Sequence, residues 1–162
     1  MPDDTEFMRR AIILARRGDR MPGGAAIGCV IVRDGAVIGE GHNEVSLRHD
    51  PTAHAEMVAI RRACDGIGAD DLRGATLYST LQPCGMCSMA SIWAKIGRVV
   101  YGAGRHQVHR MYFEDRHLDT MDFITDAFRD DIALRGGVLA AECAALYAGP
   151  GDPVPPEEQG NL

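Results

Sequence analysis

An apolar segment, a helical segment and a second apolar segment follow one another in the middle of the chain. Residues 75–81 and 98–101 have the composition of buried strands, and residues 84–96 between them have helical spacing. Pro83 precedes this helix at a position where proline is tolerated. Two strands joined through a helix lie parallel, with a right-handed crossover. The sequence therefore predicts a βαβ unit and an α/β fold.

Further elements are expected on the N-terminal side of this unit. Residues 27–32 and 37–40 flank an Asp-Gly pair at 34–35, which supplies the positive φ angles of a tight hairpin, so two antiparallel strands are predicted. A helix with an apolar side is predicted before the hairpin, over residues 3–18. A second helix, capped by its first residue, a threonine, is predicted over residues 52–64.

The C-terminal part of the chain is less regular. Residues 105–129 show no clean period, and no element is assigned to them. A short strand at 132–134 and a helix at 138–147 are expected. The final residues are rich in proline, glycine and acids, a composition typical of disordered chain. The sequence thus predicts one folded domain over residues 1–148 and a disordered acidic tail over 149–162.

Charge and composition limit the partners of the chain. A net charge of -6 and a pI near 5.4 disfavour a nucleic-acid partner, because such affinity rests largely on Lys and Arg contacts with phosphates. A small neutral substrate fits better. No apolar run approaches the roughly 20 residues that cross a bilayer, and residues 1–6 lack the basic and apolar regions of a signal peptide. We therefore expect a cytoplasmic protein with no membrane partner.

The chain has five cysteines, an odd number that favours ligands and core residues over a disulfide framework. Cys29, Cys64 and Cys143 each stand alone among apolar neighbours and are predicted to be buried in the core. Cys84 and Cys87 have the spacing of a redox or metal-binding pair.

His54 and Glu56 form an H-x-E motif about thirty residues before the P-C-x-x-C motif at 83–87. Each motif is weak alone, but together they are the signature of zinc nucleobase deaminases. Cys84 and Cys87 share one face of a first helical turn, and His54 lies in the first turn of the other helix. The sequence therefore predicts that His54, Cys84 and Cys87 hold one zinc ion beyond the ends of two helices.

Two thiolates and one imidazole leave the fourth position of a tetrahedral zinc site to water, as catalytic sites require. Zinc brings the pKa of that water to about 7. Glu56 is predicted to carry the water proton to a ring nitrogen of the substrate and then a proton to the leaving amine. The alternative is a closed structural site in which His49, His106, His109 or Cys64 is the fourth ligand.

With these motifs the chain resembles the cytidine deaminase superfamily, and more closely its tRNA adenosine deaminase and guanine deaminase branch. Residues 39–43, 50–56, 75–78 and 96–100 look like that branch. The resemblance implies a three-layer α/β/α cytidine-deaminase-like fold around a mixed five-stranded sheet, Zn2+ as the cofactor and a homodimer. It also implies that Asn43 holds the base, the alternative being a turn residue that ends a strand.

Two activities compete within this branch. Residues 139–146 look like the C-terminal helix of the tRNA adenosine deaminases, but residues 147–150 replace the arginines that follow in that family. Trp93 is similar to the Trp of a guanine deaminase Tyr-Trp-Ala motif and is expected against a flat heterocycle, with a core or dimer-interface position as the alternative. Residues 113–115 fall where guanine deaminases carry Phe-Asp-Asp. The resemblance thus implies that Asp115 assists proton transfer, the alternative being a solvated loop acid.

Several positions depart from both patterns. Gln82 replaces the usual Glu before Pro-Cys, Ala25 and Ala26 replace Pro-Phe or Pro-Val, and Met89 replaces a small Gly. These changes alter the volume and polarity of the pocket. We therefore expect zinc-dependent hydrolytic deamination of a free nucleobase or similar amino-heterocycle, such as guanine, cytosine or an aminotriazine, with release of ammonia. The alternatives are a tRNA-specific A-to-I deaminase and, after it, a non-catalytic structural zinc domain.

Overall fold

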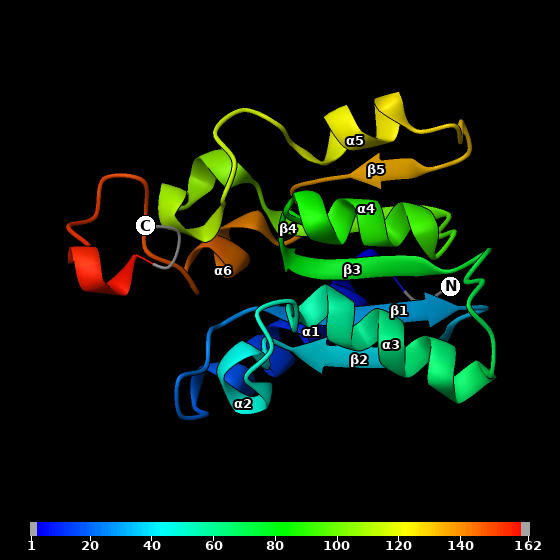
Figure 1. Cartoon of the computed structure of the whole chain (residues 1–162), viewed down its shortest axis with the longest axis horizontal. Coiled ribbons are helices and arrows are strands. Elements are labelled where there is room, and N and C mark those ends of the chain that lie inside the picture. The colour runs from blue at the N-terminus through cyan, green and yellow to red at the C-terminus, as the bar shows by residue number, and fades with distance from the viewer. Residues whose placement is uncertain (1–2, 160–162) are drawn as a thin grey trace.

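A mixed five-stranded sheet lies at the centre of the molecule (Figure 1). The computed structural model describes residues 3–159. The strand order is β2-β1-β3-β4-β5, with β1 antiparallel to β2 and β3, and with β4 parallel to β3 and β5. The predicted mixed sheet and the parallel β3–β4 pair are confirmed. The strands are β1 (Gly28–Arg33), β2 (Ala36–His42), β3 (Thr76–Leu81), β4 (Arg98–Ala103) and β5 (Ala133–Arg135).

The β1–β2 hairpin has the predicted Asp-Gly turn. Asp34 and Gly35 have φ angles of 52° and 76°, in the left-handed region that such turns require. The register shifts between Ile31 and Val32, which leaves Ile38 without a pairing partner as a bulge in β2. β2 continues to His42, two residues beyond the predicted end.

Helices cover both faces of the sheet, which gives the three layers implied by the resemblance (Figure 1). α3 and α4 pack on one face, and α1 and α6 pack on the other. None of the helices in residues 3–159 is both long enough and apolar enough to span a membrane. The helices are α1 (Asp4–Asp19), α2 (Val45–Arg48), α3 (Ala55–Ile67), α4 (Gly85–Trp93), α5 (Thr120–Asp126) and α6 (Ala140–Ala144), with three 3-10 turns, η1 (Arg105–Gln107), η2 (Arg110–Tyr112) and η3 (Pro156–Glu158).

Alternation along the strands divides the apolar residues between two cores. Val30 and Tyr78 face α1, whereas Ile31 and Leu77 face α3 and α4, because successive strand residues point to opposite faces. Burial of Cys29 and Cys143 is confirmed, while Cys64 is half-buried at the edge of the second core.

Both site helices are shorter than predicted. α3 begins at Ala55 and not at Thr52, because the Thr52 main-chain N and hydroxyl both donate to the Asp50 carboxylate in a separate turn, at 2.8 and 2.7 Å. α4 ends at Trp93 and not at residue 96, because Lys95 takes a left-handed φ of 62°. His54 and Cys84 therefore become the N-cap residues of α3 and α4.

The segment that showed no period contains η1, η2 and α5. The Asp119 side chain accepts from the main-chain N of Met121 and of Asp122, which starts α5 with a capping box. α6 is only five residues long, shorter than the predicted helix at 138–147. Beyond it, the Gly149 main-chain N donates to Asp152 and η3 follows, while the domain boundary at residue 148 stays a prediction.

Candidate metal centre and active site

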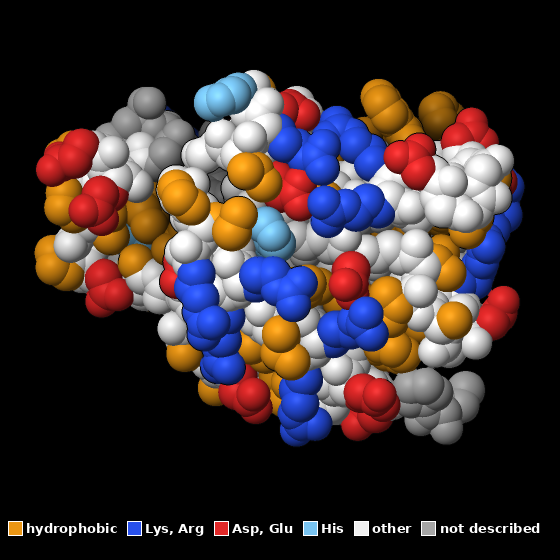
Figure 2. All heavy atoms as spheres, turned by 90° about the horizontal axis from the view of Figure 1, so that it is seen from below, with side chains coloured by type: hydrophobic (Ala, Val, Ile, Leu, Met, Phe, Trp, Pro, Cys, Tyr) orange, Lys and Arg blue, Asp and Glu red, His pale blue; other side chains and the backbone are white. Residues whose placement is uncertain are grey.

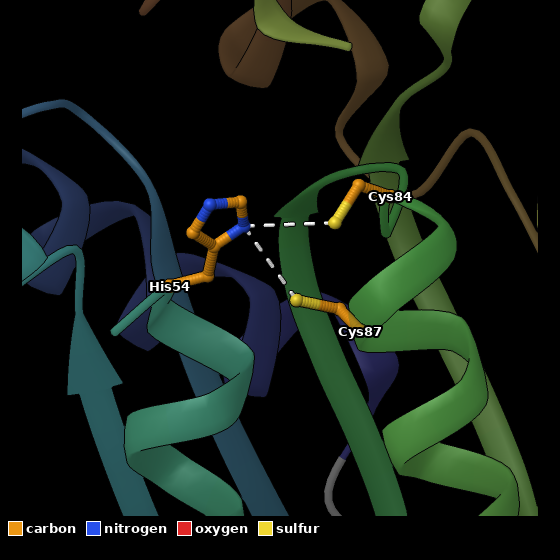
Figure 3. Close-up of side chains that lie close together, drawn as sticks. All are labelled: His54, Cys84 and Cys87. Carbon is orange, nitrogen blue, oxygen red and sulfur yellow. Dashed lines mark hydrogen bonds between the residues drawn. The ribbon is translucent and has the colours of Figure 1, made fainter. Parts of the chain in front are cut away.

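The starts of two helices bring the predicted metal ligands together (Figure 3). His54 precedes α3, and Cys84 precedes α4 directly after β3. Cys87 lies in the first turn of α4, so its sulfur points to the same side as that of Cys84. The positive ends of two helix dipoles therefore face this point, which favours thiolates there. The predicted position beyond the helix ends matches this arrangement.

The distances fit a tetrahedral zinc ion. His54 Nδ1 lies 3.6 Å from Cys84 Sγ and 3.7 Å from Cys87 Sγ. Zinc bonds of the usual lengths, at tetrahedral angles, put a ligand nitrogen and sulfur about 3.6 Å apart. All three ligand atoms lie within 4.8 Å of one another. The side chains are thus placed to hold zinc with little movement.

The protonation of the three ligands is strongly coupled. A hydrogen bond from Cys87 lowers the pKa of Cys84 to about 4, which makes Cys84 a thiolate at neutral pH. The hydrogen bond with Cys84 raises the pKa of His54 to about 9, and Cys84 also raises the pKa of the Cys87 thiol well above its usual value. A metal ion that takes these ligands must displace the protons of His54 and Cys87. Zinc binding is therefore expected to release protons.

Glu56 lies beside the ligands on the second residue of α3. Its side chain is 3% exposed, and the Ser79 hydroxyl donates to its Oε1 at 2.9 Å. Burial raises the pKa of the Glu56 carboxyl, and the charge of Cys84 raises it further. Glu56 is not a member of the three-residue ligand group. This position suits a carboxyl that exchanges protons next to the metal, and that role of Glu56 stays a prediction.

The four candidate fourth ligands lie apart from this group. Within residues 3–159, His54, Cys84 and Cys87 are the complete set of ligand-type side chains that meet at the site. The His109 ring nitrogen instead accepts from the Met111 main-chain N at 3.2 Å. The described residues therefore favour an open, three-ligand site over a closed structural one.

A cavity of about 480 Å³ adjoins the ligands. It is large enough for a heterocyclic ring, since small-molecule pockets commonly have volumes of about 300 to 1,000 Å³. Its wall carries two acids and an aromatic ring next to two of the metal ligands. The lining residues are Pro51, His54, Cys84, Gly85, Met86, Glu114, Asp115 and Phe123.

The predicted substrate residues have different positions. Asp115 lines the cavity, where Arg105 holds its carboxylate at 3.0 Å. Asn43 directly follows β2, and its side-chain oxygen accepts from the Val45 main-chain N at 3.2 Å, so its NH2 group is the part that can donate to a base. Trp93 is 75% exposed at the far end of α4, roughly 13 Å along the helix axis from Cys84. Trp93 is not part of the cavity lining within its own chain.

Three site residues were not anticipated from the sequence. Ser79 fixes the Glu56 carboxyl, Arg105 holds Asp115, and Phe123 forms a wall of the cavity. Ser79 lies in a predicted strand that gave no sign of a role. Phe123 follows the capping box that Asp119 forms with Asp122. This pair of acids three residues apart was the signal in the sequence that could have indicated a helix here.

A buried carboxyl beside a His-Cys-Cys cluster, at the shared end of two helices, is the arrangement of zinc-dependent deaminases. Residues 1–103 match the family described as the cytidine and deoxycytidylate deaminase zinc-binding region. The chain belongs to this family, and zinc is its cofactor.

Relatives with two different activities are similar to this chain. The guanine deaminase of Bacillus subtilis (strain 168) is 44% identical over 109 residues, which cover 67% of this chain and 70% of that protein. The tRNA-specific adenosine deaminase of Buchnera aphidicola subsp. Baizongia pistaciae is 38% identical over 145 residues, which cover 90% and 86%.

Solved structures give the same pair of activities. A structure from a study of A-to-I editing by tRNA:A34 deaminases has a TM-score of 0.74 at 35% identity, covering 88% of this chain and 99% of that one. The guanine deaminase from Bacillus subtilis has a TM-score of 0.62 at 46% identity, covering 65% and 66%. These similarities establish a deaminase and leave nucleobase and tRNA substrates both open.

Proposed function

We propose that the protein deaminates a free amino-heterocycle of the guanine, cytosine or aminotriazine type and releases ammonia. The observation that carries the proposal is the cavity beside His54 and Cys84. Among the described residues, its wall presents the acids Glu114 and Asp115 and no Lys or Arg. Carboxylates at this position repel phosphate groups and accept hydrogen bonds from ring N-H and amino groups. A neutral base suits this wall better than a nucleotide.

Proton transfer is the proposed role of Glu56. Bound zinc supplies a Lewis acid that lowers the pKa of a water molecule toward neutrality. The Glu56 carboxylate accepts a proton from the attacking water and delivers it to the ring nitrogen next to the C-NH2 carbon. Glu56 then takes the proton of the hydroxyl group that water has added to this carbon and gives it to the exocyclic amine, which leaves as ammonia while the C=O bond forms. The hydrogen bond from Ser79 holds one carboxyl oxygen in place during both transfers.

Asn43 and Asp115 are the proposed partners of the base. The main-chain N of Glu44, the next residue, donates to Ala53 O at 2.9 Å, which keeps the Asn43 loop beside the residues that lead into His54. The Asn43 NH2 group then donates to an acceptor of the substrate ring. Asp115, paired with Arg105, accepts from an N-H group and assists proton transfer.

The end of α6 supports a free-base substrate. The Tyr147 hydroxyl lies 2.6 Å from Thr80 Oγ1, and the Ala148 main-chain N donates to the Tyr112 hydroxyl at 3.0 Å. These contacts hold the chain after α6 against the rest of the domain. At this point of the chain, tRNA adenosine deaminases are expected to carry arginines.

tRNA adenosine deamination is the second candidate, because a tRNA-specific relative aligns with 90% of the chain. Figure 2 shows basic side chains gathered on the face below β2, with acids among them. Ion pairs such as Arg10–Glu40 at 2.7 Å and Arg62–Glu44 at 2.8 Å offset part of this charge. This balance favours the small substrate over an extended RNA contact.

A homodimer completes the proposal. The Trp93 ring is 75% exposed and offers an apolar contact to a second chain. In a dimer Trp93 would be buried between subunits, the alternative that the sequence left open. Location in the cytoplasm stays a prediction from the cysteine pattern.

A substrate panel tests the proposal. Zinc-loaded protein is incubated with guanine, cytosine, adenine, an aminotriazine and an adenosine-containing anticodon stem-loop RNA, and ammonia is measured. We expect ammonia from at least one free heterocycle and none from the RNA. Inosine formation in the RNA, without turnover of any free base, would replace the proposal with tRNA editing.

A further inference from the structure

Phe123 is a partly exposed aromatic side chain that lines the cavity next to the metal ligands. It belongs to neither of the two apolar cores formed by the described residues. Its ring also lines a second hollow formed with Met89 and Leu118. Part of this large apolar ring therefore faces the cavity, where it is available to a ligand.

Gly85 lets the Phe123 ring approach the metal site. A Cβ atom on Gly85 would lie 2.8 Å from Phe123 Cζ, closer than side chains tolerate. Gly85 is the residue directly after the ligand Cys84. The tip of the ring therefore rests on the first turn of α4, immediately beside the zinc ligands, because no side chain stands between them.

Buried hydrogen bonds fix the helix that carries Phe123. The Thr120 hydroxyl, almost fully buried, donates to Pro83 O at 3.1 Å, and the Ser88 hydroxyl donates to Thr120 Oγ1 at 3.2 Å. The start of α5 is thus bonded to the chain on both sides of Cys84. Phe123, one turn further along α5, has its position set relative to the metal ligands.

We infer that Phe123 is a specificity-determining residue that stacks on the planar heterocycle, and that Gly85 provides the space for its ring. The inference rests on the proposed deamination, and it deepens that proposal by naming the surface that selects flat aromatic substrates. Stacking of a base on an aromatic ring is sequence-tolerant, because every base has a π face. Phe123 therefore selects a flat ring, while Asn43 and Asp115 discriminate among rings by hydrogen bonds.

Substitutions at Phe123 separate stacking from a structural role. Kinetics are measured for Phe123→Leu and Phe123→Tyr with whichever substrate of the panel, free base or RNA, the wild type turns over. We expect KM of Phe123→Leu to rise about ten-fold with kcat within about two-fold, and Phe123→Tyr to stay near the wild type. Phe128→Leu, a change at a fully exposed ring on the following loop, is the matched control and should leave both constants unchanged.

Gly85→Ala provides an independent test. Alanine favours a helix over glycine, so the variant should be at least as stable and keep its zinc, yet its KM should rise because the added methyl displaces the Phe123 ring. Equilibrium dialysis of guanine, cytosine and an aminotriazine against zinc-loaded Glu56→Gln protein, with and without Phe123→Leu, measures binding directly.

The outcomes distinguish the two proposals. Unchanged KM and unchanged binding in Phe123→Leu, beside an active wild type, would overturn the stacking role and leave the proposed deamination intact. Turnover of RNA alone would overturn the free-base proposal, and the KM for that RNA would then decide the role of Phe123. A wild type that neither turns over nor binds any of these probes would overturn both.

Discussion

The Arg105 guanidinium donates to the Asp115 carboxylate and to the Asp115 main-chain oxygen, both at 3.0 Å. The same side chain also donates to Leu118 O and lies 4.7 Å above the Phe113 ring. One largely buried cation therefore holds the segment 113–118, of which Glu114 and Asp115 line the cavity next to the metal ligands.

Arg105→Ala is expected to lower kcat/KM by about ten-fold or more, because small displacements of positioned groups have large effects on rate. Arg129→Ala is the matched control, since Arg129 donates to Ile92 O and Ile96 O at the other end of α4. Both variants should lose thermal stability, and only Arg105→Ala should lose activity. If steady-state kinetics showed the same loss of activity in both variants, Arg105 would have only a general structural role.

Glu56→Gln removes the proton carrier and keeps an oxygen for the Ser79 hydroxyl. Turnover should fall by roughly 10² to 10⁴, while zinc stays near one ion per chain. Metal analysis beside ammonia release measures both properties in one preparation. Loss of zinc from this variant would show that Glu56 is a ligand.

Cys87→Ser should abolish stoichiometric zinc binding, because two ligands of the cluster remain. Cys143→Ser is the control, because this cysteine is also fully buried but is not a member of the ligand group. Zinc content after gel filtration distinguishes them. A Cys87→Ser protein that retains one zinc ion would mean that the metal has other ligands.

Acid should weaken the link between α1 and the sheet. Asp4 is 9% exposed and pairs with Arg98 at 2.7 Å and with Arg135, and the Arg98 hydrogen bond lowers the pKa of Asp4 from 3.8 to about 2. A carboxyl group whose pKa is lower in the folded protein stabilises the fold at pH values above its pKa in the unfolded chain. This stabilisation is lost as the pH falls from about 4 to 2.

The Asp4 contribution is about 2 kcal/mol at neutral pH. Asp4→Asn should therefore reduce the free energy of unfolding at pH 7 by about that amount, and the difference from wild type should shrink toward zero near pH 2. Urea unfolding at a series of pH values measures it. A difference independent of pH would exclude the ion pair as its source.

Trp93→Glu should shift the protein from dimer to monomer, because it places a charge where an apolar contact is proposed. Ile13→Glu on α1, another exposed apolar position, should not change the mass in solution. Light scattering over a range of concentrations reports the result. If both variants remained dimeric, the dimer interface would not include Trp93.

The sequence was sufficient for the parts of the molecule that depend on local pattern. The βαβ unit, the hairpin at 34–35 and the three zinc ligands follow from periodicity, turn chemistry and motif spacing. The structure of segment 105–129 could not be predicted in this way. Its position depends on single contacts, such as Arg105 to Asp115 and Thr120 to Pro83, which leave no periodic pattern in the sequence.

The helix starts show a similar limit. Thr52 was expected to cap α3, but Asp50 takes its hydroxyl and leaves that position to His54. Which of several polar residues near a helix start becomes the cap depends on competition between neighbouring side chains, and propensities alone do not decide it.

His54 and Cys84 cap the starts of α3 and α4, on segments separated by thirty positions of the chain. A metal ion bound by both residues acts as a reversible cross-link between the two segments. Cross-links stabilise the folded state mainly by restricting the conformations of the unfolded chain. The catalytic metal would thus also stabilise the folded domain. Loss of zinc would therefore lower the stability of the protein as well as its activity.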